Sequence, residues 1–434
     1  MKLLIKRAWV LDPGEKIEGE FDLLLVDGRL AEIKPDLELE ADRTIKATGF
    51  LITPGFIDLH THLREPGDEH KETIKSGGQA AARGGFTTIC CMPNTRPVND
   101  RPEITRDIID MARKESPVRV LPIAAVSREG KGQELSPMTE LAIAGAAGFS
   151  DDGQPVSNSA LMKKAMEMAA SLGLPLIDHC EEKSLTQNGV VNEGRISKLL
   201  KLKGIPAAAE EIMVARDIIL AKNFRWPVHL AHLSTRGSVD LLRWARAEGL
   251  PVTAEVTPHH LLLTEDVLLT SNPDAKVNPP LRTEEDIQSL RQALEDGLID
   301  IIATDHAPHA EEEKKTGLEK APFGINGLET AVPSLLDLLV RKQGFPLYRL
   351  IEVLTARPAK LLNLKDGGQI KKGEIADLTI IDLEGKTTIT RESMASRSHN
   401  TPFLGTTFTG SIVMTIVSGQ SVYQNKYYDK ILFV

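Results

Sequence analysis

The middle of the chain alternates short apolar runs with helical patterns, and this alternation constrains the fold more than any other feature. Each run is short, rich in apolar residues and bounded by glycine, proline or polar residues, which is typical of a buried strand. Eight such strands are expected, at 55–60, 86–93, 118–124, 145–150, 175–179, 227–232, 251–256 and 299–304.

Helical periodicity fills most of the intervals between these strands. The helices are expected at 73–83, 103–114, 159–172, 207–220, 238–247, 284–295 and 328–341. Repeated β–α units over about 300 residues predict a (β/α)8 barrel, an α/β fold whose active site lies at the carboxyl ends of the strands. The alternative is a doubly wound open sheet, but the glycine-rich phosphate loop that such a sheet favours is not visible in the sequence.

The two ends of the chain differ from the middle and resemble each other. Short β-rich segments with tight turns occur at 3–5, 21–26 and 30–33, and again at 375–381 and 412–417. We expect them to combine into one small β-sandwich domain. The predicted domains are therefore 1–53 with 365–434 for the β-sandwich, and 54–364 for the catalytic barrel.

Composition excludes several classes of function. The net charge is −9 and there is no block of lysine and arginine, which disfavours binding to nucleic acid or to an anionic membrane. No apolar run approaches the roughly 20 residues that cross a bilayer, and the first ten residues lack the apolar core of a signal peptide. Three cysteines cannot form a disulfide framework, so a cytoplasmic location is expected.

The segment Asp58-Leu59-His60-Thr61-His62 ends the first expected strand of the barrel. Alternate residues of a strand point the same way, so His60 and His62 should face a common centre. Two imidazoles that converge on one point suit a divalent metal such as zinc. The pair alone does not decide this, because it also occurs as two ordinary hydrogen-bonded polar residues.

Further histidines and aspartates follow four other strands of the expected barrel. They are Asp152, His179, His232 and Asp305, and together with the first pair they exceed one tetrahedral zinc shell. We therefore expect two metals that share a bridging carboxylate, with Asp152 as the bridge. Asp305 is expected to ligate a metal and to carry a proton, and Asp151 to support the ligands.

The remaining polar candidates near the strand ends are expected to be structural. His229 lies an odd number of residues from His232 and should face the other way along its strand. His259 and His260 are expected to line the site rather than to bind metal, and Cys180 to point away from it. His70 and His399 are expected at the surface or in packing contacts.

Four motifs carry a family resemblance: D-L-H-T-H-L-R-E-P-G at 58–67, C-M-P-N-T at 91–95, N-P-P-L-R at 278–282 and A-T-D-H-A-P-H at 303–309. They resemble the dihydroorotases, most closely the bacterial long-chain class of the amidohydrolase superfamily. The resemblance extends over the whole chain. One departure from the wider superfamily is that Asp152 stands where many relatives place a bridging carboxylated lysine.

The resemblance implies a set of site residues, a cofactor and a reaction. It implies a pair of Zn²⁺ ions bridged by Asp152, with Asp305 as the catalytic acid and base. The reaction is the reversible cyclisation of N-carbamoyl-L-aspartate to L-dihydroorotate in de novo pyrimidine (UMP) biosynthesis. The implied metal ligands are His60, His62, Asp152, His179, His232 and Asp305, and the implied substrate contacts are His62, Arg64, Asn94, Asn278, His309, Phe323 and Gly324.

Two alternatives and several partners stay open at this point. The chain could be a hydantoinase or allantoinase, or a non-catalytic subunit that serves as a scaffold for aspartate transcarbamoylase. A homodimer and a complex with aspartate transcarbamoylase are the assemblies that the family suggests. The charged segment 310–320 is either a solvated loop or a lid over the barrel mouth.

Overall fold

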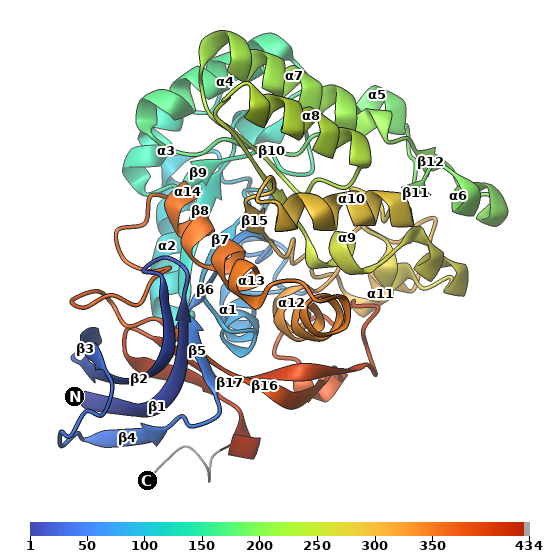
Figure 1. Cartoon of the computed structure of the whole chain (residues 1–434). Coiled ribbons are helices and arrows are strands. Elements are labelled where there is room, and N and C mark those ends of the chain that lie inside the picture. The colour runs from blue at the N-terminus through green and yellow to red at the C-terminus, as the bar shows by residue number, and fades with distance from the viewer. Residues whose placement is uncertain (429–434) are drawn as a thin grey trace.

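The computed structural model describes residues 1–428 of the chain, and a closed barrel of parallel strands occupies its middle (Figure 1). The barrel consists of two four-stranded sheets. One sheet has the order β6 (Phe56–Thr61), β7 (Phe86–Cys91), β8 (Arg119–Ala124) and β9 (Gly148–Phe149). The other has the order β10 (Ile177–Asp178), β13 (Val228–Leu230), β14 (Val252–Val256) and β15 (Ile301–Ile302).

Two isolated parallel bridges join the edges of these sheets. Thr61 pairs with His306 beyond β15, and Phe149 of β9 pairs with Leu176 before β10. The eight strands lie where the sequence predicts them, which confirms the barrel. Several are shorter than expected at both ends; β9, for example, spans 148–149 against the expected 145–150.

Helices surround the barrel (Figure 1). The predicted ones are present as α1 (Ile74–Arg83), α2 (Pro102–Glu115), α4 (Ser159–Leu172), α7 (Ala208–Phe224), α8 (Arg236–Ala247), α10 (Glu284–Glu295) and α12 (Leu328–Ser334), which continues through η4 (Leu335–Arg341). The sequence reading missed α3 (Met138–Ala144), in which Met138 and Leu141 are the buried residues. So short a helix carries too little periodicity to be recognised.

The start of α10 illustrates how the sequence sets these helices. Thr283 accepts a hydrogen bond from the backbone of Asp286, whose side chain accepts one from the backbone of Thr283 in return. This capping box satisfies amide groups that the first turn leaves free. The acidic first turn also complements the positive end of the helix dipole.

Two helices after η4, α13 (Leu347–Leu354) and α14 (Ala356–Leu361), pack against the barrel strands, and the remaining short elements lie in the loops. These remaining elements are α5 (Lys183–Thr186), β11 (Val191–Asn192), α6 (Arg195–Leu200), β12 (Gly204–Ile205), α9 (Pro258–Leu262) and α11 (Glu311–Lys314), with 3-10 turns η1 (Arg128–Gly130), η2 (Glu265–Thr270), η3 (Pro273–Ala275), η5 (Arg391–Ser393) and η6 (Lys426–Tyr428).

Alternate residues of the barrel strands enter two separate hydrophobic clusters. Leu59, Cys90 and Ile123 pack together inside the barrel, with Ala231 and Ala303 from the opposite strands. Their sequence neighbours pack outwards against the helices in a larger cluster. The two-residue period of a strand therefore fills the lower barrel with apolar side chains and leaves the strand ends for polar ones.

The strands of both chain ends join one eight-stranded sheet (Figure 1). Antiparallel pairing of β5 with β16 links the N-terminal strands to the C-terminal ones. The two ends of the chain therefore build one β-structure together, as predicted. Its strands are hydrogen-bonded into a single sheet. Its strands are β1 (Lys2–Asp12), β2 (Ile17–Val26), β3 (Arg29–Lys34), β4 (Arg43–Lys46), β5 (Leu51–Pro54), β16 (Leu378–Thr388), β17 (Thr407–Val417) and β18 (Gln420–Gln424).

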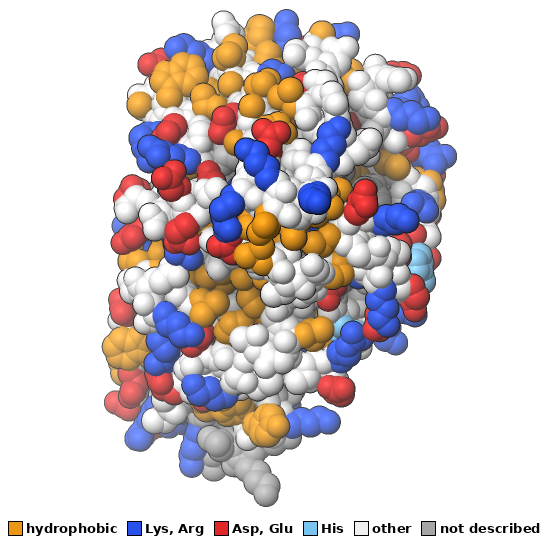
Figure 2. Space-filling view, turned by 90° about the vertical axis from the view of Figure 1, so that its right-hand side faces the viewer, with side chains coloured by type: hydrophobic (Ala, Val, Ile, Leu, Met, Phe, Trp, Pro, Cys, Tyr) orange, Lys and Arg blue, Asp and Glu red, His pale blue; other side chains and the backbone are white. Residues whose placement is uncertain are grey.

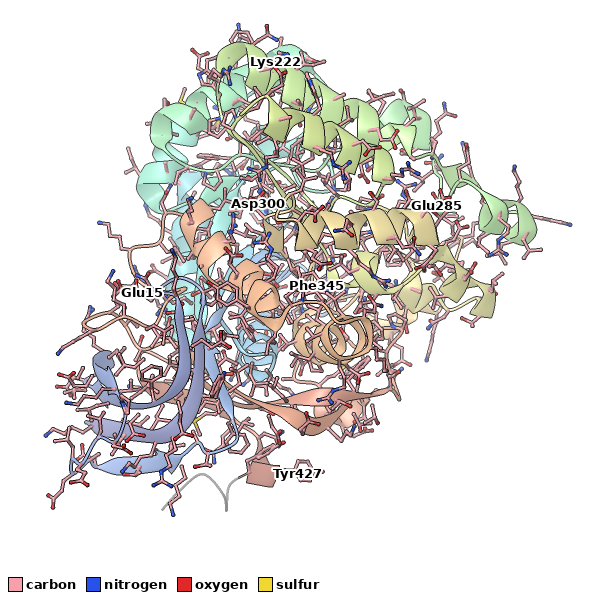
Figure 3. All side chains as sticks on the ribbon, in the orientation of Figure 1. Glu15, Lys222, Glu285, Asp300, Phe345 and Tyr427 are labelled. Carbon is pink, nitrogen blue, oxygen red and sulfur yellow. The ribbon has the colours of Figure 1, made fainter. Side chains whose placement is uncertain are left out.

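The surface carries charges of both signs. Figure 2 shows basic and acidic side chains interspersed over one face of the molecule. Lys222, Glu285 and Tyr427 project outwards, whereas Asp300 and Phe345 lie within the fold (Figure 3). Among the described residues, none of the helices is both long and apolar enough to span a membrane.

Candidate metal centre and substrate cavity

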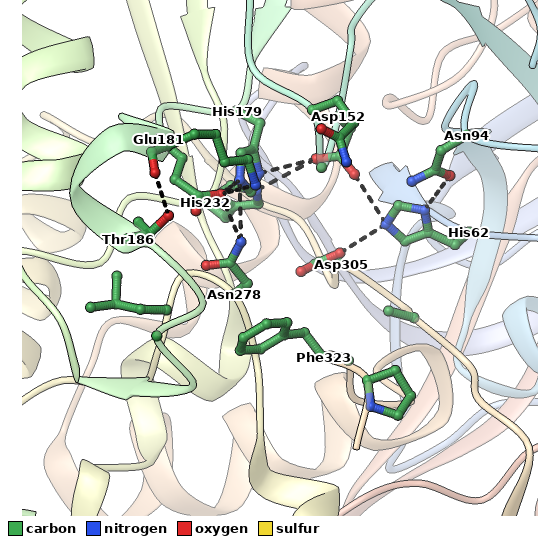
Figure 4. A pocket seen from close by; sticks show the side chains of 18 of the residues that line it. His62, Asn94, Asp152, His179, Glu181, Thr186, His232, Asn278, Asp305 and Phe323 are labelled. Atoms are coloured by element: carbon green, nitrogen blue, oxygen red, sulfur yellow. Dashed lines mark hydrogen bonds and ion pairs between the residues drawn. The ribbon is translucent and has the colours of Figure 1, made fainter. Parts of the chain in front are cut away.

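The strand ends open into a cavity of about 640 Å³ at the mouth of the barrel (Figure 4). His60 lies beneath it and is completely buried. The other residues that the sequence singles out as site residues all line this cavity, namely His62, Arg64, Asn94, Asp152, His179, His232, Asn278, Asp305, His309, Phe323 and Gly324. The structure therefore brings the whole predicted set together.

The carboxylate of Asp152 lies at the centre of the histidines, between His62 on one side and His179 with His232 on the other (Figure 4). Its Oδ2 is 3.4 Å from Nε2 of His62. Its Oδ1 is 3.3 Å from Nε2 of His60, 3.4 Å from Nδ1 of His179 and 3.6 Å from Nε2 of His232. Oδ1 thus faces three imidazoles and Oδ2 faces that of His62, so this one carboxylate lies against all four histidines.

Asp305 faces His60 and His62. Its Oδ1 lies 3.1 Å from Nε2 of His62 and 3.6 Å from Nε2 of His60. His60, His62 and Asp305 offer ligand atoms that lie within 4.8 Å of one another, and so do His60, Asp152 and His232.

The donor atoms fit divalent cations. Nε2 of His60 is buried and has no hydrogen-bond partner, although it points at the carboxylates of Asp152 and Asp305. A buried nitrogen of this kind is normally satisfied. Imidazole nitrogens with carboxylate oxygens form a typical donor set for zinc and related metals.

The electrostatics of the centre also favour positive charge. Burial alone would raise the pKa of Asp152, but the imidazole of His60 and hydrogen bonds from the neighbouring histidines hold this pKa well below its usual range. Burial would likewise lower the pKa of His179, yet Asp152 and Glu181 raise it to about 9. The buried carboxylates therefore stabilise a cation between them.

Two side chains of the cavity wall contact ring nitrogens of the imidazoles. Oδ1 of Asn94 lies 2.9 Å from Nδ1 of His62, and Oε2 of Glu181 lies 3.0 Å from Nε2 of His179. Nδ2 of Asn278 donates to the same Glu181 oxygen over 3.0 Å. Such partners orient ligand rings and select their tautomers. The sequence reading missed Glu181, and its place two residues after His179 was the available signal.

Arg64 lines the same cavity and follows the end of β6 by three residues. Its backbone is in the left-handed region, with φ of 63°, and its Nε donates to the carbonyl of Pro308 over 3.1 Å. Its second terminal nitrogen is 3.3 Å from Nε2 of His309. Held in this way, the guanidinium borders the same space as Asp305.

Asn400 organises the loop that carries His309 and Gly324. Its Oδ1 accepts from the backbone N–H of His309, and its Nδ2 donates to the carbonyls of Ala307 and Gly324 at 3.0 Å each. The sequence reading missed Asn400, which lies 91 residues from His309 along the chain. No local pattern could have signalled a contact of that separation.

The segment 310–320, all of it described by the structure, lies outside the cavity lining. Lys314 is buried, and its Nζ donates to the carbonyls of Pro322 and Gly324 over 3.0 and 3.1 Å. Glu311 makes a two-pronged ion pair with Arg391. In this arrangement the segment supports the loop of Phe323 from behind.

The prediction that His229 faces the other way along its strand from His232 is wrong. His232 has φ of 28°, so the regular alternation ends before it. His229 consequently faces the barrel interior together with Ala231 and contacts Glu255. His259 and His260 are buried and lie outside the cavity lining, while His70 is exposed and His399 is partly buried.

The barrel fold and the buried imidazole–carboxylate centre at its mouth define a metal-dependent amidohydrolase. L-Hydantoinase (dihydropyrimidinase) from Arthrobacter aurescens superposes with a TM-score of 0.88 at 28% identity, over 97% of this chain and 96% of that one. Dihydropyrimidinase from Brevibacillus agri gives 0.83 at 22% identity, over 98% and 96% of the two chains, and supports the fold alone.

Comparison with related sequences shows which family of amidohydrolases the chain belongs to. Residues 49–238 match the family model described as Dihydro-orotase-like. Dihydroorotase from Sulfurihydrogenibium sp. is 47% identical over 98% of this chain and its own full length. Dihydroorotase from Geotalea daltonii is 46% identical with the same coverage, and that from Bacillus cereus is 45% identical over 98% of this chain and 99% of its own. The chain belongs to the dihydroorotase family.

Proposed function

We propose that the chain catalyses the reversible cyclisation of N-carbamoyl-L-aspartate to L-dihydroorotate, the ring-closing step of de novo pyrimidine (UMP) biosynthesis. One observation carries the proposal: a buried centre of histidines and aspartates shares a cavity with a fixed arginine. The reaction needs both, since a cyclic amide must be activated while a carboxylate outside the ring is held. The names of the relatives support the same reaction.

The proposed cofactor is Zn²⁺, two ions per chain. His60, His62 and Asp305 would hold one ion, His179 and His232 the other, and Asp152, which faces all four imidazoles, would be shared between them. When bound, such a pair polarises the amide carbonyl as a Lewis acid. It also lowers the pKa of a water molecule, so that a nucleophile is available at neutral pH.

Asp305 is proposed as the acid and base of the reaction. In ring opening, its carboxylate takes a proton from the attacking water and delivers it to the departing ring nitrogen. In ring closure it removes the proton from the ureido nitrogen, which attacks the carboxyl carbon, and it returns that proton to the oxygen that leaves as water. Asp305 lies at the cavity wall, 3.1 Å from His62, so the same carboxylate can reach both the attacking water and the ring nitrogen of a bound substrate.

Arg64 is proposed to bind the carboxylate that does not react. A guanidinium offers a planar fork of N–H donors that matches a carboxylate. Asn94, Asn278 and His309 line the same space and would add hydrogen bonds, together with the backbone at Phe323 and Gly324. These contacts would hold the ring with its amide towards the metal centre.

The two alternatives are less well supported. Hydantoin and allantoin lack the carboxylate that a fixed Arg64 would bind, which favours dihydroorotate over them. A scaffold subunit without activity has no need of a complete ligand set, whereas all six proposed ligands converge here.

The direct test is ring opening of L-dihydroorotate by the purified, zinc-loaded chain, with hydantoin and allantoin measured in parallel. Turnover of dihydroorotate alone supports the proposal. Turnover of hydantoin or allantoin with none of dihydroorotate would replace it with the cyclic-amidase alternative. If all three fail, the assay is repeated with aspartate transcarbamoylase, and continued inactivity would favour a scaffold.

We further propose a cytoplasmic location and assembly either as a homodimer or with aspartate transcarbamoylase. The location and the association with aspartate transcarbamoylase fit a reaction that directly follows carbamoyl aspartate synthesis, and the homodimer is the other assembly that the family suggests. Sedimentation velocity of the chain, alone and mixed with aspartate transcarbamoylase, tests the assembly, and a chain that stays monomeric in both samples would contradict it.

A further inference from the structure

Behind the metal centre, Glu255 and His229 contact each other and lie on none of the cavity walls. We infer that they act as positioning residues for His60, fixing its tautomer and its direction towards the metal. The inference rests on the proposed function, because it concerns the metal centre of that reaction. It adds two residues to the machinery, neither of which is a proposed ligand.

Glu255 contacts two of the proposed metal ligands through one carboxylate oxygen. It lies at the end of β14 and is completely buried. Its Oε1 is 2.9 Å from Nδ1 of His60 and accepts from the backbone N–H of His232 at 3.4 Å. One carboxylate oxygen therefore touches two neighbouring ligand residues.

The other oxygen of Glu255 faces His229. Its Oε2 lies 3.1 Å from Nε2 of His229, whose Nδ1 is 2.8 Å from Oγ1 of Thr253. His229 and Thr253 are paired across β13 and β14, so the strand register itself sets this contact. The result is a chain of four side chains, Thr253–His229–Glu255–His60, in which Thr253 is partly exposed and the other three are buried.

The direction of the protons in this chain follows from the chemistry of its members. An ionised carboxylate only accepts hydrogen bonds, so Nδ1 of His60 and Nε2 of His229 must both carry hydrogen. The hydroxyl of Thr253 then donates to Nδ1 of His229. Nε2 of His60 is left with its lone pair directed at Asp152 and Asp305, which is the form that binds a metal.

The chain also explains how a carboxylate can be buried here. A buried charge is costly unless hydrogen bonds compensate it, and Glu255 receives three. His229 supplies the one that does not come from a ligand residue. Without His229, the oxygen that faces it would be unpaired, and the hold of Glu255 on His60 would loosen.

The test is the affinity for Zn²⁺, measured by competition with a chromophoric chelator. Loss of a residue that orients a metal ligand typically weakens metal binding by about 10- to 100-fold. We expect Glu255→Gln to lose that much at one of the two sites. The control is Asp12→Asn, which alters a buried carboxyl of β1 in the terminal sheet and should bind zinc like the wild type. Wild-type zinc affinity in Glu255→Gln would overturn the inference.

A second pair of variants covers the case in which Glu255→Gln does not fold. His229→Leu removes the N–H that Glu255 accepts, whereas His229→Gln can keep a donor there and an acceptor for Thr253. We expect weakened zinc binding in the leucine variant and recovery in the glutamine variant. Equal zinc affinity in the two would contradict the inference. Since no substrate is used, the result stands apart from whether dihydroorotate is the substrate.

Discussion

A terminal nitrogen of Arg64 lies 3.3 Å from Nε2 of His309, which is also 2.8 Å from the carbonyl oxygen of Phe323. A single ring nitrogen cannot accept from Arg64 and donate to Phe323 at once. When it donates to the carbonyl, an N–H of the arginine is free to bind a substrate carboxylate. Arg64 is therefore held in place beside His309 while one of its N–H groups stays available for a substrate carboxylate.

From this relationship we predict that Arg64→Ala lowers kcat/KM for dihydroorotate by about 10- to 100-fold, the effect of losing a hydrogen bond to a charged group. The loss should fall mainly on KM. Steady-state kinetics of ring opening measure it, and Arg96→Ala, which alters a largely exposed arginine of a neighbouring loop, is the control. An unchanged KM in Arg64→Ala would show that the carboxylate binds elsewhere.

A second prediction concerns Asp305. Asp305→Asn cannot accept the proton of the attacking water, and kcat should fall by about 10²- to 10⁴-fold, as for loss of a general base. Tight binding of dihydroorotate by the zinc-loaded variant, measured by calorimetry, should persist because Arg64 is intact. A variant that keeps a tenth of the wild-type kcat would exclude Asp305 from proton transfer.

Metal content provides a third prediction. Dialysis against a chelator should abolish ring opening, and added Zn²⁺ should restore it, with about two ions bound per chain. Asp152→Ala removes both oxygens that face the imidazoles, so its zinc content should fall below that of the wild type. Elemental analysis of the two proteins decides this, and equal zinc content would mean that Asp152 does not bridge.

Much of this centre could be predicted from the sequence, because its main residues sit at strand ends. His60, His62, His179 and Asp305 each follow an apolar run, and a barrel brings all such positions to one face. Glu255, Glu181 and Asn400 could not be found in this way. They act through hydrogen bonds whose partners are set by barrel closure and loop packing, and these leave no periodic trace in the sequence.

The prediction of the direction in which His229 faces was wrong for a local reason. Strand parity holds only while the backbone stays extended, and the positive φ of His232 ends it. The sequence carries no glycine or proline there to announce the change. Irregular backbone of this kind concentrates at functional sites, which is where pattern-based reasoning is weakest.

The support of the Phe323 loop gives a fourth prediction. Lys314→Met removes two hydrogen bonds from a buried ammonium to the carbonyls of Pro322 and Gly324. The loop should become less well positioned, and KM should rise by about tenfold, in line with one or two lost charged hydrogen bonds. Lys315→Met changes the exposed neighbour and should leave KM unaltered. Equal KM values in both variants would mean that Lys314 does not position this loop.

The last prediction concerns stability and pH at Glu329, in α12 and away from the metal centre. Burial raises the pKa of its carboxyl from the ordinary 4.5 to about 7. Between these values the folded protein holds a proton that the unfolded chain has lost, so the free energy of unfolding falls as pH rises from about 4.5 to about 7. The shift corresponds to about 3 kcal/mol at most.

Glu329→Gln keeps an acceptor for the backbone of Ala395 or Ser396 and cannot ionise. Its melting temperature should therefore decline less than that of the wild type between pH 5 and pH 8, whereas the exposed Glu384→Gln should follow the wild type. Parallel curves for Glu329→Gln and wild type would show that this carboxyl does not drive the pH dependence.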